Sequence, residues 1–152
     1  MPIADLLTIE PSLSIFYSYA RELGDIARML EGPADRKLTV LAPTNKAVMA
    51  LARKPHQSQE LEEKIEISEQ EFSEKSTENV RRWVGSHVIP AAVDMANSQS
   101  YDTLVEGKAI EFACKESGRP EDCVLDNDVH ISGVREASNG VIYIISSTIE
   151  VD

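Results

Sequence analysis

Cysteine, aromatic residues and long apolar runs are all scarce in this sequence. Its 152 residues include two cysteines, too few for a disulfide-framework domain or a structural zinc site. No stretch approaches the roughly 18 consecutive apolar residues that a membrane-spanning helix requires. The sequence also begins without a basic segment followed by an apolar run, so no signal peptide is recognised in it. We therefore expect membrane contact only through an anchor outside this segment.

Catalytic and metal-binding motifs are also missing. The sequence has no Gly-x-Ser-x-Gly elbow, no phosphate-binding glycine loop and no dinucleotide fingerprint. Its three histidines, His56, His87 and His130, do not share the short spacing of a metal site. The acidic run at residues 126–128 lacks the loop glycine and the distal glutamate of an EF-hand. We expect no catalytic residue, no metal site and no cofactor.

Negative charge dominates the ionisable residues. Lys and Arg number 15 against 26 Asp and Glu, which gives a formal net charge of −11. Such a charge repels phosphate backbones and argues against nucleic-acid binding. Residues 54–79 hold eight Glu but only three Lys, so we interpret them as an acidic insertion or loop within one domain spanning residues 1–152. Their charge would steer the protein toward basic partners.

Hydrophobic periodicity separates a helical first part from a strand-rich last part. Residues 1–53 show mainly helical spacing of apolar residues, interrupted by a buried strand that begins at Leu38. Residues 80–87 repeat apolar side chains at i, i+3, i+4 and i+7, which predicts an amphipathic helix. From Tyr101 the period changes to two, and residues 141–145 are apolar on both faces, which predicts a strand in the middle of a sheet. This order of helices and strands predicts an α+β fold.

Turn-forming residues separate the expected strands. We predict hairpin turns at three places: Glu106-Gly107, with Leu104-Val105 in the strand before it, Asp126-Asn127-Asp128, and Asn139-Gly140. The last is the strongest signal because Asn and Gly tolerate the positive φ values of a tight turn.

The start of one helix is marked by polar side chains. Pro43 ends the first strand, and the side chains of Thr44 and Asn45 are placed to accept hydrogen bonds from the first N–H groups of the helix that follows. We interpret Thr44 and Asn45, like Asn139 and Gly140, as residues that specify the fold rather than catalyse a reaction.

The two cysteines, Cys114 and Cys123, flank a segment rich in turn formers and charged residues. If residues 115–122 form the loop of a hairpin, the cysteines approach each other across the strands and can form a disulfide, which would add about 2–3 kcal/mol of stability. Two reduced thiols beside a loop are the alternative. The sequence leaves both open, because the pairing depends on the compartment.

Three segments resemble sequence boxes of the fasciclin domain family. Residues 38–48, Leu-Thr-Val-Leu-Ala-Pro-Thr-Asn-Lys-Ala-Val, resemble its Thr-Val-Phe-Ala-Pro-Thr-Asn-x-Ala-Phe box. Residues 84–90, Val-Gly-Ser-His-Val-Ile-Pro, are similar to its Leu-x-Tyr-His-Val-Val-Pro stretch. Residues 139–145, Asn-Gly-Val-Ile-Tyr-Ile-Ile, are similar to its closing Asn-Gly-Val-x-His-Val-Ile box. The resemblance covers essentially the whole chain and implies a compact β-wedge or sandwich with N-terminal helices packed around it.

The resemblance also implies a function. Fasciclin domains act mostly in cell adhesion and matrix contacts, so we expect a non-catalytic module that binds a protein partner, such as a cell-surface, matrix or wall component. The family's Tyr-His pair has been tied to integrin binding in animal members. Because Ser86 replaces the tyrosine here, we do not transfer integrin recognition. We expect the contact surface at the strand-end loops and around His87, Val88 and Ile89.

Two further expectations remain open at this point. A small-molecule or lipid carrier, or a minor hydrolase, using a cleft between helices and sheet is the alternative function. The resemblance implies an extracellular, cell-surface or vacuolar location after removal of a leader, with a cytoplasmic location as the alternative.

Overall fold

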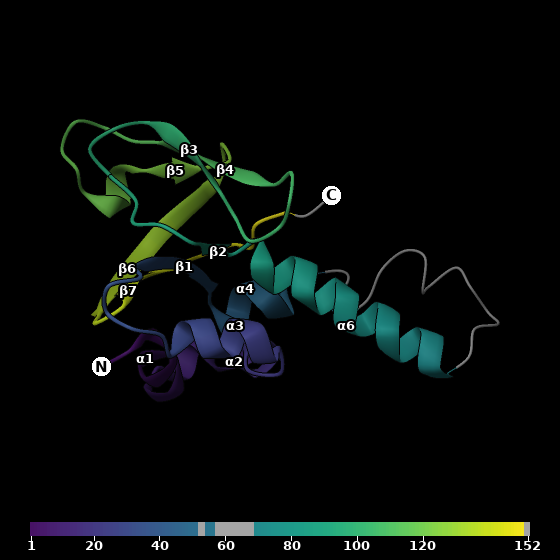
Figure 1. The fold of residues 1–152 in the computed structure, drawn as a ribbon. Helices are drawn as coiled ribbons and strands as arrows, with labels where there is room; N and C mark the ends of the chain where they lie inside the picture. Colours follow the sequence, from purple (N-terminus) through teal and green to yellow (C-terminus); the bar gives the residue numbers. More distant parts are fainter. Residues whose placement is uncertain (52–53, 57–68, 151–152) are drawn as a thin grey trace.

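The computed structural model describes residues 1–51, 54–56 and 69–150. Helices pack below a long, bent sheet, and α6 projects to one side (Figure 1). The helical elements are α1 (Ile3–Ile9), η1 (Pro11–Leu13), α2 (Ser14–Ala20), α3 (Gly24–Leu30), α4 (Asn45–Met49), α6 (Glu69–Gly85) and η2 (Pro120–Asp122). The strands are β1 (Leu38–Pro43), β2 (Val88–Ile89), β3 (Gln99–Asp102), β4 (Ala109–Ala113), β5 (Val124–Leu125), β6 (Val129–Ala137) and β7 (Gly140–Ile145).

The seven strands of the described residues form one sheet in the order β2-β1-β7-β6-β5-β4-β3. β1 and β7 run parallel, with Leu38 opposite Gly140 and Pro43 opposite Ile145. The other neighbours are antiparallel. β7 therefore lies between β1 and β6, which confirms the prediction that this strand is internal.

Strand β6 joins the two halves of the sheet. Its first residues pair with β5, and its later residues pair with β7, with a register shift between Ile131 and Gly133. An extra residue in one strand bends it and increases its twist. β6 therefore runs obliquely from the lower strands to the upper strands in Figure 1, which gives the sheet its wedge shape.

A separate hydrophobic core lies on each side of β1 and β7. Val40 and Ile142 face the core formed with α1, α2, α3 and α6. Leu41 and Tyr143 face a second core, enclosed by the upper strands. Because side chains alternate along a strand, both faces of these two strands must be apolar. The sequence shows this as uninterrupted apolar runs, and the N-terminal helices cover one face as predicted.

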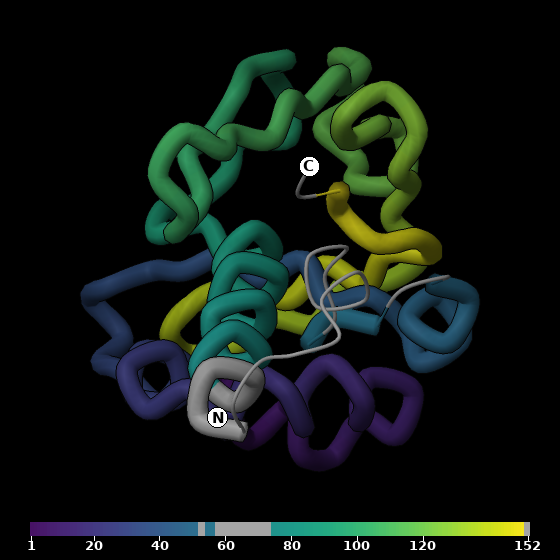
Figure 2. Tube along the Cα trace, turned by 90° about the vertical axis from the view of Figure 1, so that its right-hand side faces the viewer, coloured from purple at the N-terminus to yellow at the C-terminus, as the bar shows by residue number. Residues whose placement is uncertain are grey.

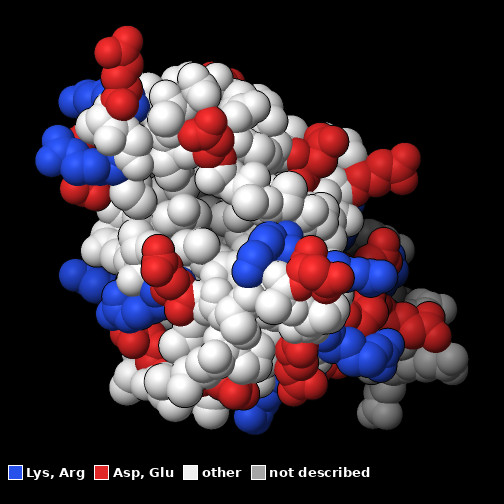
Figure 3. All heavy atoms as spheres, turned by 60° about the vertical axis from the view of Figure 1, so that its left-hand side comes forward, with Lys and Arg blue, Asp and Glu red and all other residues white. Residues whose placement is uncertain are grey.

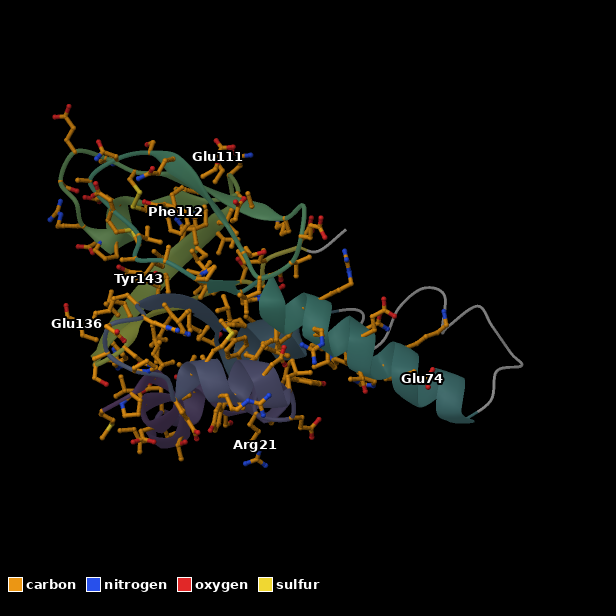
Figure 4. The ribbon with its side chains drawn as sticks, viewed as in Figure 1. Arg21, Glu74, Glu111, Phe112, Glu136 and Tyr143 are labelled. Carbon is orange, nitrogen blue, oxygen red and sulfur yellow. A yellow bond between two sulfur atoms is a disulfide. The ribbon has the colours of Figure 1, made fainter. Side chains whose placement is uncertain are left out.

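The upper strands have one face in the core and one face in solvent. In β4, Ile110 and Phe112 are buried, while Ala109, Glu111 and Ala113 are exposed. Figure 4 shows Phe112 directed into the upper part of the molecule and its neighbour Glu111 directed away from it. This pattern confirms the period of two and completes an α+β fold.

Three boundaries differ from the sequence predictions. The strand before the first hairpin is β3, and Leu104-Val105 lie in the loop that follows it. Helix α6 begins at Glu69, well before the stretch 80–87 that predicted it, and residues 57–68 of the acidic segment 54–79 lie outside the described residues. The same helix ends at Gly85, so His87 follows the helix rather than belonging to it.

Candidate functional site

A groove of about 640 Å³ opens between the helical layer and the upper strands. Five segments line it: Leu51 after α4, Arg82 of α6, residues 105–108 between β3 and β4, Asp126, Asp128 and Val129 at the β5–β6 turn, and Ser147, Thr148 and Glu150 after β7. Figure 2 shows the segment after β7, in yellow, rising from the lower layer toward the green strands. We call this hollow the groove, and residues 146–150 the C-terminal segment.

An ion pair fixes the floor of the groove. Lys108 Nζ lies 2.9 Å from Asp126 Oδ2, and the two side chains are 24% and 25% exposed. The other carboxylate oxygen, Asp126 Oδ1, accepts a hydrogen bond from the N–H of Glu111 at 2.9 Å. Asp126 and Asn127 have φ values of 48° and 72°, which the Asx side chains tolerate. The pair therefore joins the β3–β4 loop to the β5–β6 turn.

Free carboxylates stand around this floor. Glu106, Asp128 and Glu150 are exposed, and no ion pair among the described residues involves them. With Asp126, the groove has four carboxylates against the cations of Arg82 and Lys108. Its net charge is negative, so its lining favours a cationic group.

His87 lies buried behind the groove. Its Nδ1 is 2.6 Å from the carbonyl oxygen of Trp83, and its Nε2 is 3.0 Å from the backbone nitrogen of Ile149. A carbonyl can only accept and an N–H can only donate, so Nδ1 carries the proton and Nε2 accepts. The ring also packs against Phe16 and Trp83, with centroids 5.8 Å and 4.7 Å away. His87 is thus a neutral ring with both nitrogens satisfied.

Acid should destabilise the protein through His87. Burial lowers the pKa of His87 from 6.5 to about 4; the Trp83 carbonyl raises it and the charge of Lys108 lowers it. Between these two pKa values the unfolded chain binds the proton and the folded protein does not, so stability falls as the pH falls. The full effect is about 3 kcal/mol.

Urea unfolding between pH 7 and pH 4 measures this loss. The variant His87→Gln should flatten the pH dependence, whereas the matched variant His130→Gln, at an exposed position, should leave it unchanged. If the free energy of unfolding changes with pH to the same extent in both variants, groups other than His87 cause the loss of stability.

The structure corrects the expected contact surface. His87, Val88 and Ile89 are 0%, 1% and 1% exposed. Val88 belongs to the helical core and Ile89 to the upper core, because β2 pairs with β1 between the two. Their side chains are held in the interior, so they are not available for direct contact with a partner.

Thr44 and Asn45 have different roles. The Thr44 hydroxyl accepts the N–H of Ala47 at 3.1 Å and caps α4. Asn45 does not cap this helix: its Oδ1 accepts the N–H of Ile15 at 2.9 Å, and its Nδ2 donates to the carbonyl of Pro11 at 3.0 Å. It therefore ties α4 to the start of α2.

Asn139 and Gly140 also differ from expectation. Of the two, only Gly140 has a positive φ, at 152°. Asn139 is fully buried, and its Oδ1 accepts the N–H of Ile3 while its Nδ2 donates to the carbonyl of Leu30. Asn139 thus joins α1 and the end of α3 to the hairpin.

Cys114 and Cys123 form a disulfide. Cys114 follows Ala113 and Cys123 precedes Val124, and Ala113 and Val124 pair where β4 and β5 lie side by side. Met95 Sδ packs 3.4 Å from Cys123 Sγ. The bridge closes the charged loop 115–122 at the outer end of the upper strands.

The sequence predicted two of the turns that line the groove, but it did not predict that they come together to form one. Gly107 and residues 126–128 were recognised as turns, and both occupy turns here. Lys108 carried no signal of its own, since a lysine after Gly107 is typical of any exposed loop. Within the described ranges, no group of three His, Cys, Asp or Glu side chains is arranged to hold a metal ion. Nor does any helix in those ranges have the length and apolar character to cross a membrane.

Comparisons with known proteins agree with this fold. The fasciclin domain family model matches residues 11–151. A FAS1 domain-containing protein of Aspergillus fumigatus is 27% identical over 152 residues, covering 97% of this chain and 62% of that protein. Another, of Candida glabrata, is 29% identical over 160 residues, covering 94% and 62%. The chain thus spans less than two thirds of the length of these relatives.

A solved structure shares the architecture. The FAS1 domain pair of the insect cell adhesion molecule fasciclin I matches with a TM-score of 0.64 at 15% identity, covering 99% of this chain and 51% of that chain. Fasciclin domains are in general non-enzymatic modules of adhesion and protein interaction. The match over residues 11–151, the wedge-shaped sheet and its helical layer together show that the chain belongs to the fasciclin domain family.

Proposed function

We propose that this chain is a non-catalytic protein-interaction module whose groove holds a basic segment of a partner protein. The observation that carries the proposal is the groove of about 640 Å³, in which four carboxylates face two cations. One cation, Lys108, is already paired with Asp126. A lysine or arginine side chain of a partner would find unpaired carboxylates at the rim and apolar walls at Val105 and Val129.

One face of the molecule carries charges of both signs. On the face shown in Figure 3, Lys and Arg side chains stand among Asp and Glu side chains. Such a surface has little net field beyond a Debye length of about 8 Å at physiological salt. The groove therefore offers a cationic segment a combination of negative charge and concave shape.

The variant Asp128→Lys tests the groove. We expect it to weaken binding of a synthetic peptide of alternating lysine and glycine by roughly fivefold at low salt. The reason is that a carboxylate at the rim, which attracts the peptide, is replaced by a positive charge, which repels it. Fluorescence anisotropy with a labelled peptide measures the affinity, and the difference should shrink as salt rises. The matched control is Glu31→Lys, an equal charge change at an exposed residue that follows α3.

Equal weakening by both variants would mean that the peptide responds only to the net charge of the protein. This result would contradict the proposal that the peptide binds in the groove. A peptide of alternating glutamate and glycine serves as the second control. Binding of that peptide with equal affinity would also exclude the proposal.

We further propose that the natural partner is a cell-surface, matrix or wall component and that the protein is extracellular, at the cell surface or vacuolar. The Cys114–Cys123 disulfide supports this location, since such bonds persist in oxidising compartments. The intact mass of protein from its native source, alkylated without reductant, gives the test. We expect a mass without added alkyl groups, which means that the two cysteines are bridged. Two alkylated cysteines would contradict this expectation and favour the cytoplasmic location.

A second candidate function is the binding of a small molecule or lipid between helices. A hollow of about 490 Å³ is lined by Tyr19, Leu23, Ser76 and Val80, among others, from α2, α6 and their neighbours. The Ser76 hydroxyl is buried and has no hydrogen-bond partner among the described residues, and such groups are rare. Thermal unfolding with panels of lipids and sugars tests this function: a specific rise in melting temperature supports it, and none across the panel argues against it.

A further inference from the structure

The C-terminal segment forms one wall of the groove through Ser147, Thr148 and Glu150. Ile149, between them, directs its side chain into the upper core and is 1% exposed. Its N–H donates to His87 Nε2 at 3.0 Å. Among the described residues, this is the only hydrogen bond that holds residues 147–150. The position of the wall therefore depends on one acceptor and one buried side chain.

That acceptor is itself held in place. The Nδ1–H of His87 donates to the Trp83 carbonyl at 2.6 Å, and the ring packs against Phe16 of α2 and Trp83 of α6. The ring cannot turn without breaking the bond to Trp83, so Nε2 points steadily at the C-terminal segment. Lys108, on the groove floor, lies near enough for its charge to lower the pKa of this ring. His87 thus contacts the wall directly and lies within range of the charge on the floor.

We propose that His87 is the positioning residue of the groove. By accepting the Ile149 N–H, it holds Ser147, Thr148 and Glu150 against the floor, and it controls partner binding from the interior without touching the partner. The control of partner binding rests on the function proposed above, whereas the anchoring of the C-terminal segment by His87 does not.

Two variants with amide side chains distinguish the contributions of the two hydrogen bonds made by the His87 ring. His87→Asn keeps a donor near the Trp83 carbonyl but has no acceptor as far out as Nε2. His87→Gln places an acceptor near the position of Nε2. We expect the Ile149 amide to exchange with deuterium at least about tenfold faster in the Asn variant than in the Gln variant. The amide of Ile144, inside β7, reports global unfolding and serves as the reference.

The lysine–glycine peptide supplies the functional readout. Its affinity should be retained in the Gln variant and fall at least about fivefold in the Asn variant, since the wall carries Glu150. If Ile149 and Ile144 change in parallel in both variants, His87 is only a core residue and the proposal fails. If Ile149 is released while the affinity stays unchanged, control of the groove is excluded. If the wild-type protein binds no peptide, the proposed function fails, and selective release of Ile149 still supports the anchor.

Discussion

Replacing Gly140 by alanine should prevent cooperative folding, at a cost of at least about 4 kcal/mol. Gly140 opens β7 opposite Leu38, with a φ of 152° that residues with a side chain rarely adopt. A Cβ built there would overlap the carbonyl oxygen of Leu38. Neither backbone can retreat, because β1 is buried along its whole length in the interior of the sheet.

Gly107 provides the matched control. It also has a positive φ, of 82°, but a Cβ there meets no atom of the described residues within 4 Å. Gly107→Ala should therefore cost only about 1–2 kcal/mol, the strain of a left-handed conformation. Urea unfolding followed by circular dichroism measures both variants. A similar loss in the two would show that φ, and not the contact with Leu38, decides the outcome.

Asn139→Ala should cost about 3–5 kcal/mol. The change removes the acceptor of the Ile3 N–H at 2.8 Å and the donor to the Leu30 carbonyl at 3.0 Å. Both bonds are buried, so the two backbone groups are left without partners, at about 1–3 kcal/mol each. A cavity adds to this loss.

The contrast with Asn45 tests this explanation. Asn45 makes the same two kinds of bond, to Ile15 and Pro11, but it is only partly buried. Water can replace its side chain there, so Asn45→Ala should cost about 1 kcal/mol. Urea unfolding again gives both values. Equal costs would indicate that burial does not set the penalty.

Local patterns predicted the elements whose causes are local. The apolar run at residues 141–145 placed β7 inside the sheet because both of its faces are covered. Thr44 caps a helix that starts at the next residue. Gly107 and Asp126 lie in turns, where their backbones adopt positive φ values. Each of these features depends on a few neighbouring residues, so the sequence displays it directly.

Long-range partners were not predictable in the same way. Asn45 and Asn139 look like a cap and a turn residue, yet their side chains bond to Ile15 and Ile3. Similarly, His87 fits the helical spacing of residues 80–87, although α6 ends at Gly85. A Cβ on Gly85 would lie 3.1 Å from the side chain of Val105, a contact that only the folded chain brings about.

The groove could not be predicted for a related reason. It requires the β3–β4 loop, the β5–β6 turn and the C-terminal segment to meet. Their meeting depends on the bend of β6 at residues 131–133, and no residue in the sequence marks the angle of that bend.

The parallel pairing of β1 with β7 has a consequence for biosynthesis. A ribosome delivers about 5–20 residues per second, starting from the N-terminus, so β1 emerges long before the strand that completes it. Until β7 arrives, the inner edge of β1 has no partner, and such edges invite pairing with other chains. Contacts this distant in sequence also slow folding. Chaperones, or prompt synthesis of the segment that holds β7, would therefore protect the edge of β1 and favour correct folding of the nascent chain.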